Sequence, residues 1–205
     1  MPVFDKYKES RLVGLSGTFY AGKDTAADFL VGNYDFMHAS TGDILRQEAD
    51  LRGKDHQRNT LIEIGVELRK EYGSLGALVI KAIEQWERER GKYPGGLVVS
   101  GLRLVDESLE ISNQHGKLLF IDAPVELRFE RAKESTRQGK NKHDLPNNLE
   151  SFIEAEKIEL EGLGGKERPN LRGVQAISYM TIWNNGTLEE YYGQVLDVLE
   201  LSNNP

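Results

Sequence analysis

The stretch that decides the fold is Gly17-Thr18-Phe19-Tyr20-Ala21-Gly22-Lys23-Asp24-Thr25, a glycine-rich loop that runs directly into a lysine. It follows a short apolar segment, residues 12–15, and precedes a helix-like segment that begins at Lys23. A G-x-x-x-x-G-K loop in this context wraps backbone N–H groups around phosphate oxygens and adds the positive end of the next helix. The sequence therefore predicts a nucleotide-binding loop over Gly17–Thr25, with Lys23 on the transferred phosphate.

One position of this loop departs from the common pattern, which places Ser or Thr directly after the lysine as a Mg²⁺ ligand. Here that position holds Asp24, and Thr25 comes one residue later. Carboxylate oxygens suit this hard cation. We predict Mg²⁺ with Asp24 as a ligand, directly or through water, and Thr25 at the metal or an inner phosphate. Phe19 and Tyr20 are bulky for such a loop, and both packing and nucleotide contact are open for them.

Short apolar segments alternate with helix-like segments along the rest of the chain. Residues 35–40, 96–100, 117–122 and 179–183 are strand candidates, and residues 41–91 have helical spacing throughout. Such alternation predicts an α/β fold with a parallel five-stranded sheet and helices on both faces. We expect one domain over residues 11–205 after an N-terminal extension, residues 1–10. A capping-box spacing from Thr187 to Glu190 predicts the last helix.

Composition narrows the partners and the compartment. The 205 residues carry a formal net charge of -7 and no cysteine. The negative charge argues against non-specific attraction to nucleic acid or an anionic membrane, so phosphate binding must be local. Absence of cysteine excludes disulfides and thiolate metal sites, and fits a reducing cytoplasm. No apolar run approaches the roughly 18 to 20 residues that span a bilayer, so we expect a cytoplasmic protein, of undetermined oligomeric state.

A second anion site is predicted where the strand at residues 35–40 meets the next helix. Thr41-Gly42-Asp43 opens that helix behind Ser40, and Arg46 follows Asp43 by three residues, which places the two on one helix face. A guanidinium in this place can hold an acceptor phosphate with two parallel hydrogen bonds. The segment thus predicts a binding site for the molecule that receives the phosphoryl group.

These motifs closely resemble adenylate kinase and its nucleoside monophosphate kinase relatives. GLSGTFYAGKDT, HASTGDILR, the Gly65 to Arg69 spacing, SGLR, FIDAPVELRFERAKESTR and NNGTLEE occur in the order of such kinases, over most of residues 11–199. They look most like the divergent dephospho-CoA-kinase-like and adenylate-kinase-like AAA proteins and phage deoxynucleotide kinases. The resemblance implies a three-layer P-loop kinase fold, ATP as donor, a small acceptor-binding helical insert over residues 41–91 and a lid region over residues 128–161.

The resemblance also implies roles for further residues. Arg69 and Arg103 would hold the acceptor phosphate, and Ser100 stands where the family often has aspartate. Arg128, Arg131 and Arg137 would belong to the lid, with Arg131 and Arg137 stabilising the transferred phosphoryl group. Residues Asn185 and Gly186 would pass the donor adenine. For the lid arginines, a solvated amphipathic helix with Glu126, Glu130 and Glu134 as partners is the structural alternative.

Several questions stay open at this stage. The leading hypothesis is transfer of the ATP γ-phosphoryl to a nucleoside or deoxynucleoside monophosphate. One alternative is a dephospho-CoA acceptor, whose hydroxyl would need Asp43 as general base. Another is a regulatory ATPase that transfers nothing, and a nucleic-acid-end kinase is disfavoured by the charge. We expect the acidic helix at residues 150–161 to be a solvated face, although the resemblance implies that the same region forms the hinge of the lid. We expect Trp86 and Trp183 to lie in the core, and His38 to be packed or capped.

Overall fold

A computed structural model describes residues 11–135, 148–162 and 168–201. Five strands form one sheet in the order β2-β3-β1-β4-β5, and all neighbouring strands pair in parallel. This confirms the predicted parallel five-stranded sheet. The strands are β1 (Leu12–Gly17), β2 (Phe36–Ser40), β3 (Gly96–Leu102), β4 (Lys117–Asp122) and β5 (Met180–Trp183).

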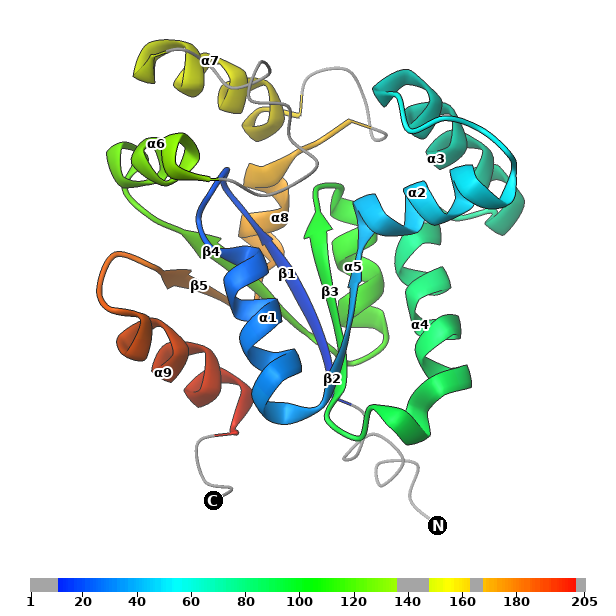
Figure 1. Ribbon diagram of the computed structural model, residues 1–205, viewed down its shortest axis with the longest axis horizontal. Coiled ribbons are helices and arrows are strands. Elements are labelled where there is room, and N and C mark those ends of the chain that lie inside the picture. The colour runs from blue at the N-terminus through cyan, green and yellow to red at the C-terminus, as the bar shows by residue number, and fades with distance from the viewer. Residues whose placement is uncertain (1–10, 136–147, 163–167, 202–205) are drawn as a thin grey trace.

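Helices cover both faces of the sheet because side chains along each buried strand alternate between two apolar cores. In β4, Leu118 and Phe120 join one core, while Leu119 and Ile121 join the other. The first core packs against α4 (Ala77–Glu89), α5 (Val105–Asn113) and α8 (Leu171–Ile177). The second packs against α1 (Lys23–Tyr34) and α9 (Leu188–Leu199). Figure 1 shows the resulting three layers.

Four helices lie outside this sandwich, toward the carboxyl ends of the strands. On the β2 side are α2 (Thr41–Leu51) and α3 (Arg58–Tyr72), and α4 ends in a short 3-10 turn, Arg90–Lys92. On the β4 side are α6 (Val125–Glu134) and α7 (Leu149–Leu160). In Figure 1 these two groups stand at opposite upper corners, with the carboxyl end of β1 between them. The helical stretch predicted at 41–91 therefore consists of three separate helices.

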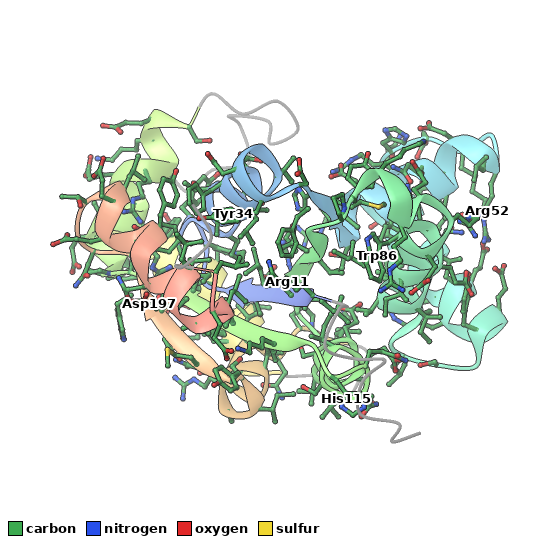
Figure 2. All side chains as sticks on the ribbon, turned by 90° about the horizontal axis from the view of Figure 1, so that it is seen from below. Arg11, Tyr34, Arg52, Trp86, His115 and Asp197 are labelled. Carbon is green, nitrogen blue, oxygen red and sulfur yellow. The ribbon has the colours of Figure 1, made fainter. Side chains whose placement is uncertain are left out.

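An arginine far from the sheet holds α2 and α3 together. The Arg52 guanidinium lies 2.7 Å from Glu67 and 3.1 Å from both Glu48 and Glu71, so it joins α2 to α3. Figure 2 shows Arg52 at one extreme of the molecule, well away from Arg11 at the start of β1. Charged contacts thus supplement the apolar contacts of this segment.

A bulge in β3 shapes the sheet next to β1. Leu15 pairs with Ser100, whereas Ser16 pairs with Leu102, so Gly101 is the extra residue. Gly101 has φ +81°, and a Cβ there would lie 2.7 Å from the Thr41 hydroxyl oxygen. That hydroxyl donates to the Gly101 carbonyl at 3.0 Å. The bulge therefore ties the start of α2 to β3, the strand next to β1, and β1 leads into the glycine-rich loop, called the phosphate loop below.

One prediction about the core was wrong. Trp86 is buried as predicted, but the Trp183 side chain is half exposed. β5 is an edge strand, and its alternation turns Ile182 inward and Trp183 outward.

Within the described parts of the chain, no helix is both long enough and apolar enough to cross a membrane.

Candidate functional site

The glycine-rich loop joins β1 to α1 in a conformation that its glycines make possible. Gly17 has φ +141°, and a Cβ there would lie 2.0 Å from the Ile121 carbonyl oxygen. Gly22 has φ +107°, and its Cβ would lie 2.3 Å from the Asn184 amide nitrogen. Only glycine fits both positions, because each combines a positive φ with a close backbone or side-chain neighbour.

Side chains from the end of β4, from the residue after β5 and from α9 form hydrogen bonds to the loop. The Thr18 hydroxyl donates to Asp122 at 2.6 Å, and the Asn184 amide donates to the Ala21 carbonyl at 2.8 Å. The Tyr191 hydroxyl donates to the Gly22 carbonyl at 2.9 Å, and burial raises the pKa of Tyr191. The loop is therefore held in shape by segments that lie more than one hundred residues later in the chain.

Lys23 lies at the first position of α1 and reaches back over the loop. Its ammonium group donates to the carbonyls of Gly17 and Thr18 at 3.0 and 2.5 Å. Asp24 is exposed and Thr25 is partly exposed on the first turn of α1. Among the described residues, no group of three or more His, Asp or Glu side chains is arranged to hold a metal ion.

The two aromatic residues of the loop pack against α7. The ring centroids of Phe19 and Tyr20 lie 6.1 and 6.2 Å from that of Phe152, which is fully buried. Tyr20 adopts a left-handed conformation with φ 55°. The packing alternative from the sequence is the one seen here, and nucleotide contact by these rings stays a prediction.

The two described arginines of α6 differ in their surroundings. Arg128 is buried and forms an ion pair with Glu156, with 2.8 Å between Nη2 and Oε2. Arg131 instead donates to the Asn184 carbonyl at 3.0 Å, and its Nη1 atom is buried without a hydrogen-bond partner. Burial lowers the pKa of Arg131. Arg137 lies outside the described residues.

The residues predicted to contact the adenine, Asn185 and Gly186, directly follow Asn184, whose carbonyl accepts from Arg131. Asn185 and Gly186 are exposed, in the connection between β5 and α9. The capping box predicted for α9 is present, with the Thr187 hydroxyl accepting from the Glu190 N–H and the Glu190 carboxylate accepting from the Thr187 N–H. The connection between β5 and α9 is therefore fixed by the capping box at its end and by the Arg131 contact at its start. Asn185 and Gly186 lie between them at the surface.

The start of α2 faces the same edge of the sheet from the β2 side. Ser40 caps the helix by accepting from the Asp43 N–H at 3.2 Å, and Asp43 forms an ion pair with Arg46 on the exposed surface. Burial alone would raise the pKa of Asp43, but the hydrogen bond and the charge of Arg46 together lower it. Thr41 is buried and Gly42 is partly exposed beside the Arg46 guanidinium. Both side chains of the pair are about half exposed.

A buried carboxylate links the other two predicted acceptor arginines. Glu107 lies 3.3 Å from the Arg69 guanidinium and accepts from the Arg103 N–H at 3.4 Å. Burial raises the pKa of Glu107, against the lowering effect of Arg69. The Nε atom of Arg69 is buried without a hydrogen-bond partner. The Arg103 side chain is half exposed and lies 2.6 Å from Glu159 of α7.

Ser100, near the carboxyl end of β3, stands where the resembled family often has aspartate, and it forms a polar contact with β2. Ser100 is buried, and its hydroxyl lies 2.8 Å from Nε2 of His38 on β2. His38 is partly buried, in agreement with the packed role expected for it. Ser100 is thus engaged with its neighbouring strand.

Comparison with known proteins places this geometry in a family. Residues 13–146 match the family described as AAA domain. A UPF0200 protein of Pyrococcus horikoshii is 32% identical over 174 residues, which cover 81% of this chain and 85% of that protein. The chain belongs to the AAA domain and UPF0200 families. A UPF0200/UPF0201 protein of Archaeoglobus fulgidus is 28% identical over 93% of this chain, which spans only 55% of that longer relative.

Solved structures resemble this UPF0200 chain in fold. A protein of Thermus thermophilus named TT1252 superposes with a TM-score of 0.56 at 17% identity, covering 96% of this chain and all of that one. Shikimate kinase of Bacteroides thetaiotaomicron gives a TM-score of 0.51 at 16% identity, covering 93% and 99%. At such identities the likeness concerns the fold. It confirms the P-loop kinase architecture that the sequence motifs predict.

Sequence reasoning missed several residues that shape the UPF0200 site. Asp122 is the last residue of β4, a strand that was predicted correctly. A carboxylate at the carboxyl end of a parallel strand was therefore a signal that could have identified it. Asn184 belongs to the turn predicted before the last helix, but no role was predicted for it. Glu156 and Glu159 were assigned to a solvated helix face, which was wrong because both are buried against arginines. Only their spacing of three residues hinted at a shared face.

Proposed function

We propose that this chain is an ATP-dependent phosphotransferase that moves the γ-phosphoryl group of ATP to a nucleoside or deoxynucleoside monophosphate. The observation that carries the proposal is a pair of buried arginine donors without partners, Arg131 Nη1 beside the phosphate loop and Arg69 Nε on the acceptor side. An unpaired buried donor costs about 1 to 3 kcal/mol. One anionic ligand at the loop and another at the acceptor side, both at the carboxyl ends of the strands, would accept hydrogen bonds from these two donors.

The donor half of the proposal rests on the loop between β1 and α1. Its backbone N–H groups and the positive end of α1 would bind the phosphates of ATP, with Lys23 on the transferred group. Arg131 would stabilise charge on that group, together with Arg137. Arg128 contacts the loop from behind, and Asn185 and Gly186 would lie beside the adenine.

Mg²⁺ fits the exposed oxygens at the start of α1. Asp24 would hold it directly or through water, with Thr25 as a second oxygen ligand or a contact to an inner phosphate. When bound, the cation neutralises part of the charge on the phosphate oxygens.

The acceptor half rests on the start of α2 and the end of β3. Arg46 would exchange its contact with Asp43 for the acceptor phosphate, and Arg69 and Arg103 would complete the binding site, next to Thr41 and Gly42. An acceptor phosphate oxygen would then attack the γ-phosphorus as the bond to the ADP oxygen breaks. No covalent enzyme intermediate is needed, because positioning and charge stabilisation supply the catalysis.

The competing hydroxyl acceptor makes a separate demand on Asp43. A hydroxyl must lose a proton during transfer, whereas a monophosphate is already anionic. The pKa of Asp43 is lowered, which keeps it deprotonated but makes it a weaker base. If Asp43 is the base, Asp43→Asn will reduce transfer to dephospho-CoA about a hundredfold and transfer to monophosphates much less. Asp50→Asn, on the exposed surface of α2, is the control. Equal small losses on both acceptors would remove Asp43 from that role.

The decisive experiment is a panel assay of ADP formation. Purified protein is mixed with ATP and Mg²⁺ and tested against ribo- and deoxyribonucleoside monophosphates and dephospho-CoA, with Lys23→Ala as the blank. Stimulation by one or more monophosphates supports the proposal. Slow ATP hydrolysis that no acceptor stimulates would favour a regulatory ATPase and contradict it.

A further inference from the structure

The acidic helix α7 buries one carboxylate directly against the phosphate loop. The Glu156 side chain is only 5% exposed. One of its oxygens accepts the Phe19 backbone N–H at 2.9 Å, and both oxygens accept from the Arg128 guanidinium. A buried carboxylate is retained where it is fully hydrogen-bonded, as here. Glu156 therefore joins α7 to the third residue of the loop.

The Phe19 residue is held on both of its backbone polar groups. Glu156 takes the N–H, and Arg128 Nη1 donates to the carbonyl at 3.2 Å. Arg128 is itself fixed by a 2.8 Å hydrogen bond from Nε to the Ala123 carbonyl, just beyond β4. The ion pair thus anchors the loop to the sheet through the start of α6. Because the Phe19 N–H is committed to Glu156, residues later in the loop supply the N–H groups for phosphate.

One turn before Glu156 on the same helix, Phe152 supports the loop by packing. Its ring contacts the rings of Phe19 and Tyr20. Tyr20 is in the left-handed region, which costs a residue other than glycine roughly 1 kcal/mol or more. Packing against Phe152 offsets this cost. One face of α7 therefore holds both the position and the local conformation of the loop.

We propose that Glu156 and Phe152 are positioning residues on one face of α7 that together set the nucleotide affinity of the phosphate loop. Glu156 acts through Arg128 and the Phe19 peptide, and Phe152 acts through the rings of Phe19 and Tyr20. The inference rests on the donor half of the proposed function, that the loop binds a nucleotide, and is independent of the acceptor. Glu156 does not itself touch the nucleotide. Its effect comes from keeping the later N–H groups of the loop aligned for phosphate.

The test is Glu156→Gln, with ADP affinity measured by titration calorimetry without any acceptor. Glutamine replaces one of two accepting oxygens by a donor that faces other donors, so the Phe19 and Arg128 contacts cannot all persist. We expect ADP to bind about tenfold more weakly, the equivalent of one lost charge-assisted hydrogen bond. Thermal unfolding is recorded for each variant.

The matched control is Glu48→Gln in α2. Glu48 is also buried and paired with two basic residues, Arg52 and Lys81, but it lies away from the loop. Both variants should unfold at a lower temperature, and only Glu156→Gln should lose ADP affinity. If the two variants lose stability alike and both bind ADP within about twofold of the wild type, Glu156 is merely structural and the proposal is overturned.

A second variant decides if Glu156→Gln fails to fold. Phe152→Leu keeps the ion pair and removes the ring contacts to the loop, and Phe36→Leu at the start of β2 is the control for losing a buried ring. We expect about threefold weaker ADP binding for Phe152→Leu alone, and equal affinity for the two overturns the inference. Wild-type protein that binds no ADP would refute the donor assignment and this inference together. ADP binding without phosphoryl transfer would refute only the acceptor half.

Discussion

The donor loop and the acceptor helix meet the same edge of the sheet, but they are held in different ways. Several contacts that shape the loop come from distant and mostly buried partners, such as Asp122, Asn184 and Glu156. At the start of α2, the predicted ligand groups Asp43 and Arg46 are paired with each other and half exposed. The loop is held mainly by residues distant in the chain, whereas the Asp43–Arg46 pair forms within one turn of α2.

This difference indicates where affinity and where selectivity arise. A loop whose backbone is already fixed loses little conformational entropy when it binds phosphate. A half-exposed ion pair on a helix surface is worth at most about 1 kcal/mol, so a ligand can exchange one partner at small cost. We therefore expect donor binding to be sensitive to changes throughout the fold, and acceptor binding to be sensitive to a few residues of α2 and β3.

The largest expected effect is the loss of the loop lysine. Lys23→Ala should reduce phosphoryl transfer about a thousandfold, because it removes the cation that stabilises charge on the transferred group. The fold should persist, since its ammonium group bonds to carbonyls within the loop itself. A coupled assay of ADP release measures this, with Lys133→Ala on the exposed side of α6 as control. Activity within tenfold of the wild type would contradict the role of Lys23.

Two glycines test the contrast between the regions directly. Gly17→Ala should destabilise the fold by about 3 kcal/mol or more, because its Cβ would collide with the β4 backbone. Gly42→Ala in α2 meets only ordinary contacts and should be neutral or stabilising by about 0.5 to 1 kcal/mol. Chemical denaturation measures both. Similar stability losses would mean that the two regions are equally constrained.

A smaller and more selective effect is expected at the acceptor arginine. Arg46→Ala should raise the KM for a stimulating monophosphate about tenfold, the equivalent of roughly 1.4 kcal/mol, while the Kd for ADP stays unchanged. Steady-state kinetics and calorimetry on the same preparation separate the two. A parallel loss of ADP affinity would show that the acceptor side is coupled to the loop.

The smallest effect concerns the pH dependence of the Asp43–Arg46 pair. The pKa of Asp43 in the folded protein lies below its ordinary value of 3.8. The pair therefore stabilises the fold above that value, and the contribution is lost as the pH falls through the folded pKa. Asp43→Asn should cost under about 0.5 kcal/mol at neutral pH, since the pair is solvent-screened. The difference in denaturation midpoint from wild type should vanish in strong acid, and persistence there would exclude this origin.

Much of the fold followed from local patterns. The bounds of β4 were predicted to the residue, and the caps at Ser40 and Thr187 are present, because capping depends on neighbours within three positions. Helix α8 was missed, since its seven residues carry too few apolar repeats to stand out. The buried carboxylates of α7 were also missed. Their charge indicated a solvated face, and only tertiary contact identifies their arginine partners.

The contacts that fix the donor loop also bear on when it forms. The hydrogen bonds of the loop join Thr18 to Asp122, Phe19 to Glu156 and Ala21 to Asn184. Asn184 lies 163 residues after Ala21 in the chain. Contacts of such long range form slowly and only after the intervening chain has been ordered. During synthesis on the ribosome, the loop emerges before the residues that hold it, so its binding shape must await β5, the last strand of the described sheet. A nascent chain that ends before β5 should carry the complete loop sequence and fail to retain nucleotide.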